Sequence, residues 1–155
     1  MAARLQGEAA LALGDLGFAD ERLHHALARA RANNLVEEEL AARTALASLH
    51  HRRANTTYAR EHLDAVWDAA DRGPYPLRHA DARNVLAEIE IAENDFPAAI
   101  KAATTAYRLA WCDGPPFAND YGLRTARAHL RALGTGTRDA AVRRVEARAD
   151  RGDPD

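Results

Sequence analysis

Seven histidines are the residues of this chain that could bind a metal ion: His24, His25, His50, His51, His62, His79 and His129. Helices usually present zinc ligands from positions three or four residues apart, and no two of these histidines have that spacing. Adjacent histidines point about 100° apart on a helix, so they cannot easily share one ion. The pattern therefore favours exposed or packing histidines and predicts no metal site. Convergence of His51, His62 and His79 in the folded chain stays open.

Other groups that could carry catalysis do not form a constellation. Cys112 precedes Asp113 at the predicted end of a helix, where the helix dipole and the carboxylate both raise a thiol pKa. Lys101 lies between Ile100 and Ala102, so the chain has no phosphate-binding loop of the Gly-Lys-Ser/Thr type. The segment 134–136, Gly-Thr-Gly, is too short for a dinucleotide loop. We therefore expect neither an enzyme nor a cofactor.

Composition points to helices and to an ordinary protein surface. Alanine, the best helix former, supplies 37 of the 155 residues, while β-branched and aromatic residues are sparse. The net charge is −2, from 21 basic and 23 acidic residues intermixed along the chain, which argues against a nucleic-acid partner. Arginine outnumbers lysine twenty to one, a bias typical of GC-rich bacteria.

The compartment expected for the chain is the cytoplasm. Cys112 is the only cysteine, so no internal disulfide can form and a reducing environment fits best. The first residues, MAARLQGEAALALGDLG, carry Glu8 and Asp15 and predict an amphipathic helix rather than a signal peptide. Apolar runs of about eighteen residues do not occur in the sequence, so no membrane association is expected.

Glycine, proline and asparagine divide the sequence into helical runs. Asn55 or Thr56 can cap one of these helices, and Pro97 falls at the start of another, where its missing N–H is harmless. The predicted helices are Ala2–Leu13, Phe18–Ala32, Val36–Arg53, Thr57–Asp71, Leu77–Glu93, Phe96–Trp111 and Ala118–Leu133, with a last one from about Thr137 to Ala149.

Equivalent positions in these helices recur every 40 residues. The turns between paired helices fall at Gly14, Ala54, Asn94 and Gly134, and small residues recur at the same interval within the helices. A fixed period of this kind is typical of a solenoid, in which each helical hairpin covers its neighbour. We predict one domain over residues 1–150, with repeats at about 1–34, 36–73 and 76–113, a cap of one or two helices at 116–150, and a polar tail at 151–155.

The small residues resemble those of the tetratricopeptide repeat. That family has a small residue midway along its first helix, glycine at the turn, and alanine early and late in its second helix. The positions that match are Gly7, Gly14, Ala19 and Ala26, then Ala47, Ala59 and Leu63, then Ala87, Ala99 and Ala106. The period exceeds the usual one of about 34 residues, and Ala10, His50 and Glu90 replace expected aromatic residues. The resemblance implies an all-α, right-handed α-solenoid of antiparallel helix pairs.

A second resemblance covers residues 79–134. The motif Trp111-Cys112-Asp113-Gly114-Pro115-Pro116, followed by Tyr121-Gly122-Leu123, is similar to the closing repeats of the helical tails of bacterial STAND-type signalling ATPases. Those tails are thought to sense a ligand or partner and to restrain the ATPase. This resemblance implies, as an alternative function, a ligand-sensing regulatory tail of a signal-transduction ATPase or transcriptional regulator.

The main expectation is a scaffold that binds a protein or peptide partner in a concave groove, with self-association left open. In tetratricopeptide solenoids the first helix of each pair lines this groove, and its arginines would suit a partner that carries carboxylates. A solvated helix face with no partner is an equally good interpretation of the same pattern. The groove positions that the resemblance implies are Arg4, Glu8, Thr44, Ser48, His51, Asp81, Asn84, Glu88, Tyr121, Arg124 and Arg131.

Overall fold

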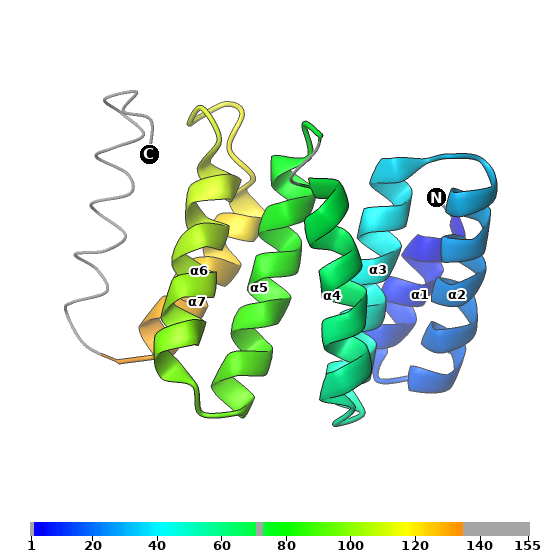
Figure 1. Ribbon diagram of the computed structural model, residues 1–155, viewed down its shortest axis with the longest axis horizontal. Coiled ribbons are helices and arrows are strands. Elements are labelled where there is room, and N and C mark those ends of the chain that lie inside the picture. Colours follow the sequence, from blue (N-terminus) through cyan, green and yellow to red (C-terminus); the bar gives the residue numbers. More distant parts are fainter. Residues whose placement is uncertain (1, 71–72, 135–155) are drawn as a thin grey trace. The chain divides into compact units, whose positions relative to one another are not determined.

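The computed structural model describes residues 2–70 and 73–134, and within these ranges the chain forms seven helices and no strand (Figure 1). The prediction of an all-α fold is therefore confirmed for this part of the chain. The predicted helix from about Thr137 lies outside the described residues. The helices are α1 (Ala2–Leu13), α2 (Leu16–Ala32), α3 (Val36–Arg52), α4 (Thr56–Ala70), α5 (Pro76–Ala92), α6 (Phe96–Trp111) and α7 (Asp120–Ala132).

Three hairpins are closed by turns with the same local geometry. Gly14, Ala54 and Asn94 end α1, α3 and α5 with φ angles of 84°, 56° and 62°. The N–H of the following residue in each turn bonds to a carbonyl five residues back, at 2.9 Å in all three cases. This is the Schellman arrangement, which satisfies the last carbonyl groups of a helix.

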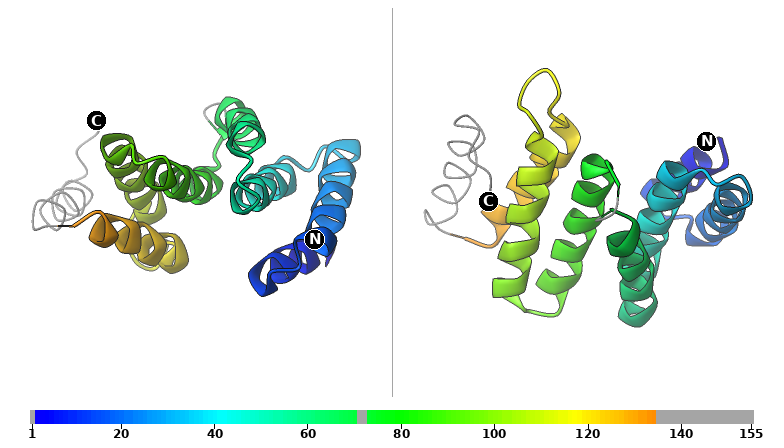
Figure 2. Two further views of the ribbon diagram at one scale, coloured as in Figure 1. Left: turned by 90° about the horizontal axis from the view of Figure 1, so that it is seen from below. Right: turned by 45° about the horizontal axis from the view of Figure 1, so that its top comes forward.

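The residue after each left-handed position caps the next helix. The side chains of Asp15 and Asp95 accept the N–H groups of Phe18 and Ala98 at 3.0 Å, and Asn55 accepts that of Tyr58 at 3.5 Å. One short turn therefore ends a helix and begins the next without an intervening loop (Figures 1 and 2). The paired helices lie side by side as a result.

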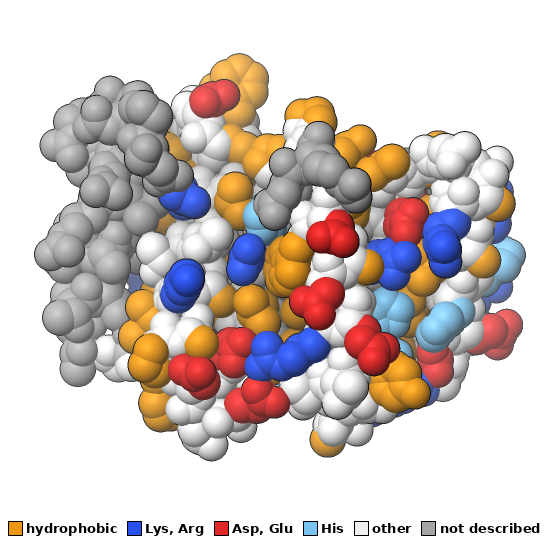
Figure 3. All heavy atoms as spheres, in the orientation of Figure 1, with side chains coloured by type: hydrophobic (Ala, Val, Ile, Leu, Met, Phe, Trp, Pro, Cys, Tyr) orange, Lys and Arg blue, Asp and Glu red, His pale blue; other side chains and the backbone are white. Residues whose placement is uncertain are grey.

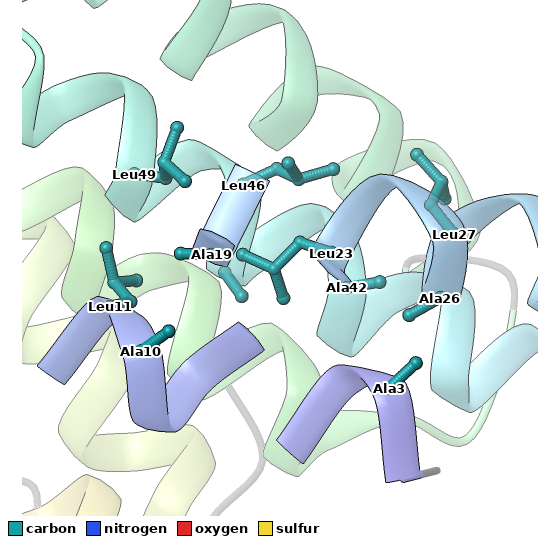
Figure 4. Close-up of a cluster of buried hydrophobic side chains, with 11 residues drawn as sticks. Ala3, Ala10, Leu11, Ala19, Leu23, Ala26, Leu27, Ala42, Leu46 and Leu49 are labelled. Atoms are coloured by element: carbon teal, nitrogen blue, oxygen red, sulfur yellow. The ribbon is translucent and has the colours of Figure 1, made fainter. Parts of the chain in front are cut away.

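Compact packing divides the chain between Arg78 and His79 into an N-terminal unit and a C-terminal unit. The core of the N-terminal unit is built largely from alanine and leucine. Leu23 of α2 is fully buried, and Figure 4 shows Ala19 and Leu23 pointing toward side chains from α1 and α3. Ala10 and Leu11 of α1 pack in this cluster with Leu46 and Leu49 of α3. A single domain over residues 1–150 stays a prediction.

The core of the C-terminal unit joins α5, α6 and α7. One cluster centres on fully buried Tyr107 and includes Ala80, Leu123 and Ala126, and a second contains Ala87, Ala103 and Leu130. Ala59 and Ala99, which the repeat pattern predicts at close helix contacts, are both fully buried in their units. Within residues 2–70 and 73–134, none of the helices combines the length and apolar character needed to cross a membrane.

Candidate functional site

Helix α7 has one buried face and one exposed face. Leu123, Ala126 and Leu130 point into the C-terminal core. Tyr121, Arg124 and Arg131 are exposed, and their spacing of three and seven residues places them along one side of the helix. We call these three residues the α7 stripe. It places one aromatic side chain and two arginine side chains on the exposed side of a helix.

Four contacts fix the position of α7. The side-chain amide of Asn84 on α5 donates to the Gly122 carbonyl at 3.2 Å, and Arg127 donates to the Tyr107 hydroxyl at 2.8 Å. The Arg127 guanidinium also lies 5.2 Å from the centre of the Tyr107 ring. A β-carbon at Gly122 would come within 3.1 Å of Ala110, so α6 and α7 approach closely there. These contacts hold the stripe in one orientation.

The loop before α7 continues the exposed surface at Phe117, which is 69% exposed, as is Tyr121. The loop is ordered by its own backbone, because the N–H of Phe117 donates to the Gly114 carbonyl at 2.8 Å and that of Asn119 donates to Ala110 at 2.8 Å. Asn119 then caps α7 by accepting the Gly122 N–H at 3.3 Å. Two aromatic side chains therefore flank the start of α7 in a defined backbone.

Three of the predicted groove positions lie inside their units. Arg4 donates to Glu38 at 3.0 Å and to Glu8 at 2.6 Å, so it joins α1 to α3. The Thr44 hydroxyl donates to the Leu40 carbonyl of its own helix at 2.9 Å. Asn84 is 5% exposed and bonds to α7. The structure therefore shows these three side chains packed within their units.

The other predicted positions on α1, α3 and α5 are half-buried: Glu8, Ser48, His51, Asp81 and Glu88. Glu88 faces α7, where its carboxylate lies 3.4 Å from Nε2 of His129. The structure brings Asn84, Glu88 and the α7 stripe into one unit, although Asn84 lies beneath its surface. A partner-binding role for any of the eleven positions stays a prediction.

Three histidines of the N-terminal unit form a cluster that their spacing in the sequence did not predict, and several histidine side chains lie at the surface of this unit in Figure 3. His50 and His62 stack with ring centres 5.5 Å apart, and His24 meets His62 edge-on at 6.5 Å. The contact between His50 and His62 could have been expected from the sequence, because the last turn of α3 faces the first turns of α4 across a tight hairpin. Neither His51 nor His79 takes part, and no group of three His, Cys, Asp or Glu side chains in the described ranges is arranged to hold a metal ion.

Cys112 has the environment of an unreactive thiol. Burial raises its pKa, and the charge of Asp113 raises it further. Its Sγ donates to the Leu109 carbonyl at 3.2 Å. A thiolate is therefore disfavoured at this position, as the sequence predicted.

Comparison of the chain with protein-family models, curated proteins and solved structures finds no match.

Proposed function

We propose that the chain is an interaction module whose α7 stripe binds a protein or peptide segment that carries carboxylates. The observation behind this proposal is the exposure of Tyr121, Arg124 and Arg131 along one side of a helix whose opposite side is buried. Tyrosine and arginine are enriched among the residues that dominate binding energy at protein interfaces. Arginine also binds carboxylates through two parallel hydrogen bonds, which sets the direction of a partner.

Rigid support favours this surface over the others in the chain. The contacts of Asn84 and Arg127 position α7 before any partner arrives, so ordering the helix costs no further entropy on binding. Phe117 and Tyr121 add apolar area beside the guanidinium groups. An amphipathic aromatic and a cation side by side suit a partner with an acidic residue next to an apolar one.

The proposal includes a tetratricopeptide-like solenoid as the scaffold. Its support is the shared geometry of the turns at Gly14, Ala54 and Asn94, which lie 40 residues apart and each join a Schellman end to an Asx cap. The same backbone at a fixed interval is what a repeated helical hairpin produces.

A photocrosslinking experiment tests the α7 stripe directly. A benzophenone amino acid replaces Tyr121 in one variant and Tyr58 of α4, which is 53% exposed, in the control. Irradiation in cells should yield a crosslinked partner from position 121 and not from position 58. Crosslinking at neither position, or equally at both, contradicts the proposal.

Reversing the charges of the α7 stripe is the second test of the proposal. Arg124→Glu with Arg131→Glu should abolish the crosslink from position 121, because the partner's carboxylates would meet carboxylates. The matched control is Arg29→Glu with Lys101→Glu, which changes the net charge equally at exposed positions on α2 and α6. Arg29 and Arg131 both lie in the last turn of a helix, so their effects on the helix dipole match. Unchanged crosslinking in the stripe variant would place the binding surface elsewhere.

A further inference from the structure

Three of the five histidines in the N-terminal unit form one cluster that joins three helices. His24 comes from α2, His50 from the last turn of α3, and His62 from α4, and we call them the histidine stack. The rings of His50 and His62 are nearly parallel, with an angle of 12° between their planes. Tyr58 also stacks on His50, with ring centres 5.5 Å apart. The contact between α3 and α4 therefore depends on aromatic rings that can acquire charge.

The stack is arranged for neutral imidazoles. The Nδ1 atoms of both His50 and His62 are buried and make no hydrogen bond. A neutral imidazole needs a donor on only one nitrogen, whereas the protonated ring carries a proton on both. Protonation would therefore bury an N–H group without an acceptor and place positive rings 5.5 Å apart.

The charged groups around the stack do not offset the cost of protonating His50 and His62. On α2, Asp20 is held at 2.6 Å by Arg53 and at 2.8 Å by His24. On α3, Arg43 adds positive charge near His62, and its partner Glu39 lies 2.8 Å away. On α4, the charge of Glu61 raises the pKa of His50, but less than the charge of Asp20 does. The nearby carboxylates Asp20 and Glu39 are thus already engaged by arginine.

The pKa values follow from this environment. Burial, together with the smaller effect of positive charge on His50, Arg43 and His24, lowers the pKa of His62 from 6.5 to about 4. Burial also lowers the pKa of His50, against the opposing effect of Asp20.

We infer that the histidine stack is a proton-sensitive contact, which holds α4 against α3 and α2 while His50 and His62 are neutral and whose hold on α4 weakens in mildly acidic solution. This device is independent of partner binding by α7, because it lies wholly within the N-terminal unit. It would make opening of that unit depend on pH in a range where most carboxylates stay ionised.

The direction of the pH dependence follows from linkage. The pKa of His62 is lower in the closed state than in the open state, so the open state binds more protons. Stability is full above about pH 6.5 and falls with pH until it levels off near pH 4. The difference between 6.5 and about 4 limits the change in the folding equilibrium constant to roughly 300-fold, of which roughly 70-fold falls between about pH 7.5 and pH 4.5.

Carboxylates act mainly below this window. The hydrogen bond from Arg4 lowers the pKa of Glu38, against the effect of burial. Burial alone would raise the pKa of Asp20, but the hydrogen bond and charge of Arg53, together with His24, lower it. Both carboxylates therefore contribute stability above their ordinary pKa values, and that contribution is lost as pH falls through their lowered values. The interval from about pH 6.5 to 4.5 isolates the histidines.

The test measures urea unfolding of the full chain against pH, with a chelator present. Trp111→Phe leaves Trp67 of α4 as the only tryptophan, so its emission reports the N-terminal unit. In this background, His62→Phe keeps an aromatic ring that cannot be protonated. His25→Phe, at an exposed position of α2, is the matched control.

We expect the parent and His25→Phe to lose roughly 70-fold in the folding equilibrium constant between about pH 7.5 and pH 4.5, and His62→Phe to lose less than a fifth of that. An equal loss in all three proteins overturns the inference. If His62→Phe does not fold, the inference is tested instead by NMR titration of the His62 imidazole in the unaltered chain. A midpoint near 4 supports the stack, and a midpoint at or above 6.5 refutes it.

Discussion

Replacing Gly7 with alanine should destabilise the N-terminal unit, although alanine is the better helix former. Gly7 lies in α1 where the helix meets Leu23 of α2. A β-carbon at Gly7 would come within 2.6 Å of Cγ and 2.8 Å of Cδ2 of Leu23, and 3.3 Å of its backbone nitrogen. Leu23 is fully buried between α1 and α3, so its side chain cannot rotate away cheaply.

Two opposing terms set the magnitude of this effect. Alanine in place of glycine within a helix stabilises by about 0.5–1 kcal/mol. Overpacking a filled core costs about 1–3 kcal/mol. We therefore expect a net loss of about 0.5–2 kcal/mol in the free energy of unfolding. Gly17 in α2 is the matched control, because its β-carbon would meet nothing closer than 3.8 Å and the residue is exposed. Gly17→Ala should stabilise by a few tenths of a kcal/mol, up to about 1.

The assay is urea unfolding followed by Trp67 emission in the Trp111→Phe background. Leu23→Ala supplies a double-mutant cycle, because it removes the atoms that the new methyl group meets. The two changes together should cost less than their sum by about 0.5–3 kcal/mol. Equal stabilisation by Gly7→Ala and Gly17→Ala would refute the packing of α1 against α2 described above.

Four further substitutions test the turns and the repeat positions. Asp15→Ala and Asp95→Ala each remove a cap and should cost about 1 kcal/mol, the first in unfolding reported by Trp67 and the second in unfolding reported by Trp111. Ala54→Gly should stabilise the N-terminal unit by about 0.5–1 kcal/mol, because Ala54 has a φ of 56° that glycine adopts without strain, and a loss in the urea midpoint would contradict this. Ala99→Leu should lower the melting temperature through an overpacking cost of about 1–3 kcal/mol, since Ala99 is fully buried.

The helices could be predicted from the sequence because their ends are set by local chemistry. Asn94 and Gly14 tolerate a left-handed backbone, and Asp95 and Asp15 cap the next helix within one turn. Predicted helix ends differ from the observed ones by two residues at most. Ala54 is the exception in kind, because alanine disfavours a positive φ and only its place in the 40-residue pattern identified it as a turn.

The candidate site could be predicted only in part, because it depends on how each helix is rotated about its axis. The resemblance placed Asn84 and Arg124 on one open face by their spacing of 40 residues. The structure buries Asn84 against Gly122 and leaves Arg124 exposed, since α7 packs over α5 at that position. The histidine stack was missed for a related reason. His50 and His62 meet across a hairpin, and a search for ligands along single helices does not test such pairs.

The alanine content of the core links these features. Burying alanine removes little apolar surface from water, at roughly 0.8 kcal/mol for each methyl-sized group. A core built from Ala19, Ala42 and Ala45 therefore gains its stability from close helix approach, which depends on Gly7 having no side chain.

Polar contacts between helices then carry more of the specificity than they would in a core of larger side chains. Arg4 joins α1 to α3, and Asn84 joins α5 to α7. With a total stability on the order of 5–15 kcal/mol for a small domain, a penalty of 2–3 kcal/mol at one contact is a large fraction of the whole. Protonating His62 imposes a cost of about this size between α3 and α4. Protonation at this contact is therefore expected to remove a large part of the stability of the N-terminal unit.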